Sequence, residues 1–458
     1  MIVLAAGLAA PTSAPVAGPL ASAMRAAADP LAGAVRAAIS TRTSDPELAA
    51  FYAARNYRPL WIDGRRVRPE ARVLIAALQD AAAENLRPAD YDPAGVAAAV
   101  RGARSGRPAA LARAELALSR ALGAYGEDLH RAKAGAEMLY TDAAVQPALT
   151  TERSVLETAA AAPTLAQGLA AVRRMNPIYD ALRVALAHEA AAGGTRAALI
   201  RANLERARAL PIDLGRRYVL VDIAAQRLWM YQDGRPRDSM RVVVGKPSEP
   251  TPSLAGVIRY AVFRPYWNVP PDLVRASVAP KVLAQGLGYF HAQHFEALSD
   301  WSDDARVLDP AAVDWKAVVA GREELRVRQR PGRGNMMGQM KFIFPNDLGV
   351  YLHDTPLRSL FADDQRTASA GCVRLEDAAR LGRWLLSAEA VEAAHVPGPP
   401  EERVNLAEPT PVYLVYLTAE PAGGALSLRP DIYGRDRGIV ADAGGPVSMG
   451  QGRLAAAR

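Results

Sequence analysis

The sequence contains a single cysteine, Cys372, in the segment SAGCVR at residues 369–374. A lone thiol forms no intramolecular disulfide and cannot build a cysteine-rich metal site, so Cys372 is either buried packing or a nucleophile. Lone cysteines are more often inert packing, but this one follows a glycine and precedes Arg374. His353 lies upstream in the segment YLHDTP at residues 351–356. A flexible neighbour, a nearby cation and a histidine favour a nucleophile.

The proposed pair needs a chain that folds back on itself, because residues 353 and 372 are too far apart to share one helical turn. Residues 350–353 alternate like a strand and place His353 at or near its end. Glu376 and Asp377 open a helical stretch, so we expect Cys372 just before a helix N-terminus, where the dipole stabilises a thiolate. His353 would accept the thiol proton and hold it as an imidazolium, which predicts an ion pair at neutral pH.

Residues beside the pair suggest how a reaction intermediate could be held. The backbone N–H groups of Ala370, Gly371 and Cys372 could line an oxyanion hole. Ser369 is interpreted as an organiser of this backbone or as a neighbour of that hole. The group that orients the histidine is either the backbone carbonyl of Asp354 or its carboxylate, and the sequence does not distinguish them.

Two regions with different residue patterns, one helical and one strand-like, must position these residues. Residues 25–205 are predicted to form an all-α scaffold domain: Asp45-Pro46-Glu47 is a typical helix start, and residues 69–85 and 109–133 carry leucines at helical spacing. Residues 206–437 are predicted to be mostly β. Asp233-Gly234 between two strand-like runs, 227–231 and 237–244, indicates a hairpin.

Further strands of this second region are expected at residues 218–221, 257–263, 341–344, 350–353 and 412–417. Residues 272–328 have mixed helical and loop character and are predicted to be an insertion that caps a cleft. Residues 438–458 are rich in Gly and Ala and are expected to form a flexible tail. The fold class is therefore α+β and multidomain.

The N-terminal residues 1–24 resemble the apolar part of a secretory signal that ends in a small-x-small site, Ala21-Ser22-Ala23. Prolines at positions 11, 15 and 19 argue against a membrane span. We therefore expect an exported protein of the periplasm or cell envelope, whose mature form does not span a membrane.

Composition excludes some partners. The formal net charge is +7 and charged residues make up 22% of the chain, which is ordinary for a globular protein. No Lys/Arg block with interleaved aromatics is present, so nucleic acid is not expected as a partner. His291 and His294 lie three residues apart but lack further ligands, so no metal site is expected.

The segments around Cys372 and His353 closely resemble those of the L,D-transpeptidases of bacterial cell walls, in particular the long periplasmic type with a helical scaffold domain. The resemblance extends to other segments: NLER (203–206), WNVPP (267–271), VDW (313–315), PGRGN (331–335), KFIFPN (341–346) and DIYG (431–434). It covers roughly residues 45–436 and is densest after residue 200.

This resemblance implies a mostly β catalytic domain with a capping insertion, and a role in peptidoglycan and cell-wall biogenesis and cell shape. Cys372 would attack a tetrapeptide stem, release D-Ala and form a thioester, and a second stem would then complete a 3→3 cross-link. His353 would act as base and then as acid, while Tyr351 and Arg374 would line the substrate site. Carbapenem-type β-lactams would be covalent inhibitors, and no cofactor would be needed.

Two departures from the family pattern are visible. Many members have a histidine at the position of Ala370, so here the role of base falls on His353 alone. The long type commonly carries a peptidoglycan-binding module between scaffold and catalytic parts, and such a module is not found before residue 203.

Other functions remain open. The same acyl-enzyme could pass to water, which would make the protein an L,D-carboxypeptidase or amidase. A non-catalytic wall-binding protein is a second alternative, although the intact set of Cys372, His353 and Arg374 argues against a decayed site. A papain-like protease is disfavoured because the order of cysteine and histidine is reversed.

Overall fold

The computed structural model describes residues 29–42, 45–133, 136, 138–191, 196–422 and 425–437. The expected signal segment 1–24 and tail 438–458 lie outside these residues. The chain forms two compact units, one from Met1–Arg131 with Ala148–Arg174 and the other from Ala132–Pro147 with Met175–Arg458. In the described part of the chain, no helix is long and apolar enough to cross a membrane.

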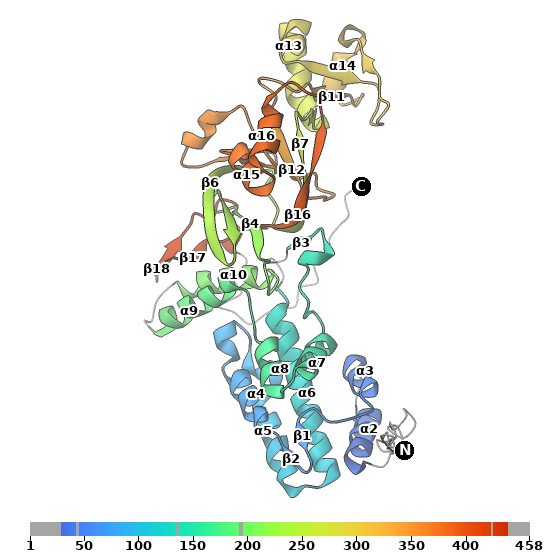
Figure 1. Ribbon diagram of the computed structural model, residues 1–458, viewed down its shortest axis with the longest axis vertical. Coiled ribbons are helices and arrows are strands. Elements are labelled where there is room, and N and C mark those ends of the chain that lie inside the picture. The colour runs from blue at the N-terminus through green and yellow to red at the C-terminus, as the bar shows by residue number, and fades with distance from the viewer. Residues whose placement is uncertain are drawn as a thin grey trace, which may run out of the picture. The chain divides into compact units, whose positions relative to one another are not determined.

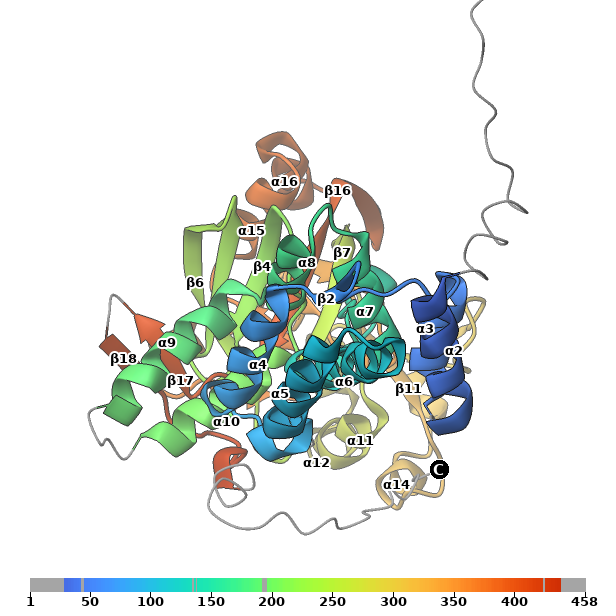
Figure 2. The ribbon, with the colours of Figure 1, turned by 90° about the horizontal axis from the view of Figure 1, so that it is seen from below.

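The first unit is largely helical, as predicted. The expected helix start is confirmed: the carboxylate of Asp45 caps α3 by accepting hydrogen bonds from the N–H groups of Glu47 and Leu48 at 3.1 and 3.0 Å. Figures 1 and 2 both show α4, α5 and α6 side by side. The helices are α2 (Pro30–Arg42), α3 (Pro46–Ala54), α4 (Glu70–Gln79), α5 (Pro93–Gly102), α6 (Pro108–His130), α7 (Glu152–Ala161) and α8 (Leu165–Val172), with a short hairpin of β1 (Ile62–Asp63) and β2 (Arg66–Val67).

The second unit is built on a ten-stranded sheet in the order β12-β13-β15-β6-β5-β4-β16-β7-β3, with β14 paired to β6. Because β12 also pairs with β7, this sheet closes on itself. Its strands are β3 (Leu139–Tyr140), β4 (Arg217–Asp222), β5 (Arg227–Gln232), β6 (Arg235–Gly245), β7 (Leu254–Phe263), β12 (Met340–Ile343), β13 (Leu352–His353), β14 (Thr367–Ser369), β15 (Val373–Leu375) and β16 (Glu402–Val415).

The predicted hairpin is confirmed between β5 and β6. Asp233 and Gly234 have φ values of 53° and 71°, which is the backbone conformation that a two-residue turn of this kind requires. The strand faces that turn inward carry buried Val, Leu and Met side chains. Helices α15 (Ala378–Leu385) and α16 (Ala388–His395) add Leu381, Leu385 and Val391 to the same core.

The expected insertion has a core of its own. It contains a four-stranded antiparallel sheet in the order β10-β9-β11-β8, which begins at Trp267, five residues before the predicted boundary at 272. Its elements are β8 (Trp267–Val269), α11 (Pro271–Leu273), a π-helical turn (Val274–Val278), α12 (Ala279–Gln285), α13 (Leu287–Ala292), β9 (Phe295–Leu298), β10 (Val307–Leu308), α14 (Trp315–Val319) and β11 (Arg326–Gln329). Phe290 and Trp315 contact edge to face within this core. In Figure 1 these elements, drawn in yellow, lie at one end of the closed sheet.

Helices α9 (Pro177–Ala191) and α10 (Ala197–Arg208) belong to the second unit, although the scaffold was expected to reach residue 205. The reason is a set of buried polar contacts between α10 and the segment after β16. The Asn203 side chain is 0% exposed. It donates to Thr418 Oγ1 at 2.9 Å and accepts from the Thr418 N–H at 2.8 Å. A further hairpin, β17 (Ala419–Ala422) and β18 (Ala425–Leu428), follows directly.

Asn203→Ala is expected to lower the free energy of unfolding by about 1–3 kcal/mol, because the buried Thr418 amide would lose its partner. The measurement is chemical denaturation followed by circular dichroism. Asn405→Ala is the matched control, since Asn405 is exposed and such surface changes usually stay within about 0.5 kcal/mol. If both variants lost the same free energy of unfolding, this account of how α10 is attached to the segment after β16 would be contradicted.

Candidate active site

The strand that carries His353 is held between two other strands. Strand β13 lies between β12 and β15, with Lys341 paired to His353 and His353 paired to Arg374. Paired residues on neighbouring strands project from the same face. Lys341, His353 and Arg374 therefore form one row across three strands. The adjacent side chains of Phe342, Leu352 and Val373 are 0% exposed in the core on the opposite face.

Cys372 lies on the same face as this row. The Val373 N–H donates to the Tyr351 carbonyl at 3.0 Å, so Tyr351 and Cys372 lie beside each other just before the paired residues. Each precedes a member of the row by two positions, and side chains two apart share a face. Diagonal neighbours on adjacent strands have Cα atoms roughly 7–8 Å apart, within reach of long side chains. The predicted residues Tyr351, His353, Cys372 and Arg374 are thus brought together.

The turn that presents Cys372 is held by Ser369. Its hydroxyl donates to the Cys372 carbonyl at 2.5 Å and accepts from the Gly371 N–H at 3.2 Å. Gly371 has φ +102°, in the region that favours glycine. Because the Gly371 N–H already has a partner, the expectation that it lines an oxyanion hole is corrected. The amides of Ala370 and Cys372 stay candidates for that role.

A residue that sequence reasoning missed, Thr251, supports this turn from behind. Its hydroxyl donates to the Gly371 carbonyl at 2.9 Å and accepts from the Gly245 N–H at 2.9 Å. The Lys246 N–H donates to the Ser369 carbonyl at 2.9 Å. Residue 251 is far from 371 in the chain, and no local sequence signal links the two.

His353 is oriented by a backbone carbonyl. Its Nδ1 lies 2.6 Å from the Asp354 carbonyl oxygen, and a carbonyl only accepts, so Nδ1 carries the proton and Nε2 keeps the lone pair. The Asp354 carboxylate is engaged elsewhere, with the Gln339 N–H at 2.9 Å and Arg358 Nη2 at 2.6 Å. Of the two orienters left open by the sequence, the carbonyl makes the contact.

The electrostatics of the pair differ from the sequence expectation. Burial lowers the pKa of His353 to about 3, and the positive charges of Arg374 and Lys341 act in the same direction. Burial raises the pKa of the Cys372 thiol, against the smaller opposing effects of the Tyr351 amide and of Arg374. The resting pair is therefore a neutral thiol and a neutral imidazole, and the predicted ion pair at neutral pH is wrong.

The expected helix N-terminus is also not at the cysteine. Cys372 runs into strand β15, and α15 begins only at Ala378, capped by Asp377. The N-terminus of α15 is therefore not at Cys372, and the expected stabilisation of a thiolate by its dipole does not apply. Instead the half-buried Cys372 Sγ lies 3.4 Å from the Gly349 carbonyl, which can accept the S–H proton.

Among the residues that the structure describes, Arg374 has no acidic partner. Its Nε atom is buried and has no hydrogen-bond partner, and none of the ion pairs within the described residues includes its guanidinium. Burial lowers the pKa of Arg374, and the nearby Cys372 opposes that effect. A half-buried cation of this kind favours an incoming anion. Tyr351 stands beside it, with its pKa raised by burial and by Cys372.

Lys341 was part of a motif noted in the sequence but was given no role there. It faces His353 across the strand pair and makes a salt bridge with Glu401 at 3.2 Å. Its ammonium also lies 6.0 Å from the centre of the Tyr351 ring. It is the second of two cations that flank the histidine. Among the described residues, no group of three or more His, Cys, Asp or Glu side chains is placed to hold a metal ion.

Comparison with known families agrees with this site. Residues 216–413 match the model of the L,D-transpeptidase catalytic domain, and residues 46–186 match that of the scaffold domain. The chain carries an L,D-transpeptidase catalytic domain. It is thus a helical scaffold region followed by a mostly β transpeptidase domain, as the sequence predicted.

One curated relative is a Haemophilus influenzae protein named "Putative L,D-transpeptidase", with 33% identity over 225 residues. The match covers 48% of this chain and 45% of the relative, so the chain spans less than half of that protein's length. Two solved structures share 14% identity. The Ldtfm–avibactam carbamoyl enzyme is matched over 45% of this chain and 51% of its own, with a TM-score of 0.21. The L,D-transpeptidase from Mycobacterium smegmatis is matched over 43% of this chain and 58% of its own, with a TM-score of 0.22. TM-scores this low carry no weight for the fold.

Stability should depend on pH through His353. The unfolded imidazole binds a proton below about pH 6.5, whereas the folded one stays neutral down to about pH 3. The unfolded state then binds more protons, so stability falls as pH drops from 6.5 towards 3. His353→Gln should reduce this fall, measured as the free energy of unfolding at pH 7.5 and 4.5.

His395→Gln is the control, because this histidine is exposed at the end of α16. It is expected to retain the wild-type pH dependence. If His353→Gln keeps it as well, the buried neutral state of His353 is refuted.

Proposed function

We propose that this protein is a peptidoglycan L,D-transpeptidase that forms 3→3 cross-links through a thioester on Cys372. The observation that carries the proposal is the placement of a neutral, tethered His353 on the same face as Cys372, on neighbouring strands. A histidine whose Nδ1–H is fixed to a carbonyl presents Nε2 as a base, as acyl transfer by a thiol requires.

In the first half-reaction, Cys372 Sγ attacks the stem-peptide carbonyl carbon while its proton passes to His353 Nε2. The tetrahedral oxyanion would be held by the backbone amides of Ala370 and Cys372. The bond to the D-Ala nitrogen then breaks, and the imidazolium gives its proton to this leaving amine. A thioester remains on Cys372.

In the second half-reaction, the side-chain amine of another stem attacks the thioester carbonyl and transfers a proton to Nε2. The C–S bond breaks and the thiol regains its proton. No cofactor takes part in these steps. We place this activity in the periplasm or cell envelope, where the wall is built, with stem peptides as partners and with roles in wall biogenesis and cell shape.

Substrate binding would activate the resting pair. Arg374 is one cause of the low pKa of His353, and a substrate carboxylate paired with Arg374 would cancel that repulsion. The histidine would then become a stronger base only when the cleft is occupied. Tyr351, beside Cys372 on the same face, would contact the bound stem.

Cys372→Ala should abolish the covalent adduct with a carbapenem, because the sequence has no other cysteine. The adduct is read as a mass shift of the intact protein. Ser105→Ala, a change at an exposed serine of the first unit, is the comparison that should still acylate. An adduct on Cys372→Ala would identify another nucleophile.

His353→Ala should slow acylation by a factor of about 10²–10⁴, the usual size of a lost general base. Stopped-flow quenching of protein fluorescence by the carbapenem gives the rate. His395→Ala, an exposed histidine on α16, should acylate at the wild-type rate. A wild-type rate in His353→Ala would remove this residue from the mechanism.

The acceptor is tested with purified disaccharide-tetrapeptide and mass analysis of the products. The proposal expects a cross-linked dimer together with free D-Ala. Tripeptide without dimer would make the protein an L,D-carboxypeptidase instead. Unchanged substrate in the presence of intact, folded protein would favour a wall-binding role.

A further inference from the structure

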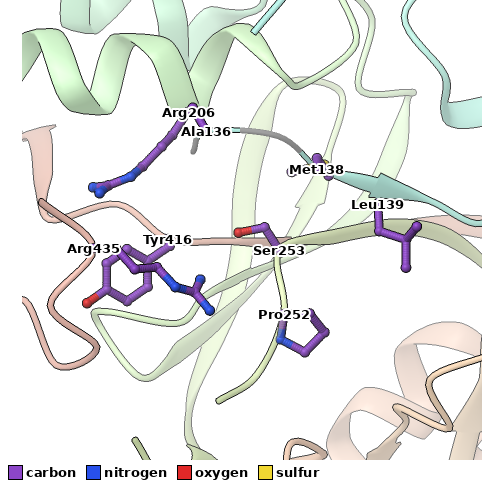
Figure 3. Close-up of a pocket in the computed structure, with 8 residues that line it drawn as sticks. All are labelled: Ala136, Met138, Leu139, Arg206, Pro252, Ser253, Tyr416 and Arg435. Atoms are coloured by element: carbon purple, nitrogen blue, oxygen red, sulfur yellow. The ribbon is translucent and has the colours of Figure 1, made fainter. Parts of the chain in front are cut away.

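A pocket lies in the second unit of the chain and shares no lining residue with the site described above. It has a volume of about 440 Å³, which is within the usual range for small-molecule sites. Figure 3 shows its eight lining residues. They come from α10, from β3 and the segment before it, from the segment before β7, and from the chain after β16. They are Ala136, Met138, Leu139, Arg206, Pro252, Ser253, Tyr416 and Arg435.

Two guanidinium groups flank one aromatic ring in this pocket. The Arg206 and Arg435 guanidinium carbons lie 5.1 and 4.8 Å from the centre of the Tyr416 ring. Arg206 is only 6% exposed, and its Nη2 atom is buried without a hydrogen-bond partner. A buried N–H group of a charged side chain without a partner is costly, so it marks a place where a ligand oxygen would be stabilised.

The carboxylates that balance these charges are not part of the lining. Asp436 binds Arg206 Nη1 at 2.7 Å and accepts from the Thr418 hydroxyl at 3.0 Å. Asp431 accepts from the Tyr416 hydroxyl at 2.6 Å. Both arginines line the pocket, whereas neither of the two carboxylates that balance their charges does.

Apart from Ser253, the rest of the lining is apolar. Figure 3 places Met138, Leu139 and Pro252 across from the two arginines and Tyr416. Leu139 is 45% exposed although it is large and hydrophobic. An arginine pair opposite small apolar surface suits a carboxylate that carries an alkyl group, because guanidinium binds carboxylate through paired hydrogen bonds.

We propose that this pocket binds a carboxylate with a small alkyl substituent, such as the C-terminal residue of a short peptide. The pocket also adjoins the support of the nucleophile turn. Arg435 Nη2 donates to the Thr251 carbonyl at 3.1 Å, and the Thr251 hydroxyl holds the Gly371 carbonyl. A ligand on Arg435 is thus connected through one residue to the backbone before Cys372.

The test uses the full chain with Cys372→Ala, so that binding is measured without turnover. The probe is N-acetyl-D-alanine, followed by saturation-transfer NMR, with inorganic phosphate as a second probe. Leu139→Glu, which adds a carboxylate at the pocket wall, should weaken acetyl-alanine binding by about tenfold or more through like-charge repulsion.

Leu428→Glu is the matched control, because Leu428 has the same 45% exposure and lies outside the pocket. It should bind the probe as the parent does. Ser253→Glu is a second pocket variant, used if thermal melting shows that Leu139→Glu is not folded. Equal binding by the pocket variants and the control would overturn the proposal.

Arg374→Gln separates this inference from the proposed catalytic function. It should leave probe binding unchanged, whereas loss of binding there would locate the probe in the catalytic cleft and refute the second site. Binding of phosphate but not of acetyl-alanine would overturn the assignment of a carboxylate with an alkyl group.

Discussion

The register of three short strands determines the chemistry of this protein. Strands β12, β13 and β15 align Lys341, His353 and Arg374 in one row, and the same register places Cys372 beside Tyr351. A slip of one residue would turn His353 into the core and Leu352 onto the opposite face of the sheet. The buried Phe342, Leu352 and Val373 oppose such a slip. The hydrophobic core therefore maintains the alignment of the reactive groups.

The same row explains why His353 and Cys372 are both uncharged in the resting site. A histidine between two cations in a buried position is neutral, and the adjacent thiol keeps its proton. Tethering through Nδ1 preserves the tautomer needed for proton transfer even though the imidazole is a weak base. Under the proposed function, pairing of Arg374 with a substrate carboxylate would change this balance, so that the basicity of His353 would depend on bound substrate.

Local patterns in the sequence predicted the parts of the structure that depend on neighbouring residues. The Asp45 cap, the Asp233-Gly234 hairpin and the strands around His353 are of this kind. The return of the chain to bring Cys372 to His353 was also expected, because the spacing left no other way for them to meet. These features follow from turn chemistry and periodicity.

The features that the sequence did not predict depend on pairing between distant strands and on burial. The sequence placed Cys372 at a helix start, but a three-residue strand intervenes before α15. It also predicted an ion pair between Cys372 and His353, which is wrong. The burial of His353 and the charge of Lys341 opposite it depend on strands that are distant in the chain, so local patterns could not reveal them. Thr251 could not be found for the same reason. The attachment of α9 and α10 to the catalytic unit depends likewise on contacts such as Asn203 with Thr418.

The protonated state of the only sulfhydryl in the chain has a bearing on its chemical durability. Oxidants and foreign disulfides react with the anionic form of sulfur far faster than with the protonated form. Cys372 at rest is therefore a slow target for peroxide and for mixed-disulfide formation. With no second cysteine in the chain to repair such damage by exchange, this inertness preserves the protein between encounters with its ligand.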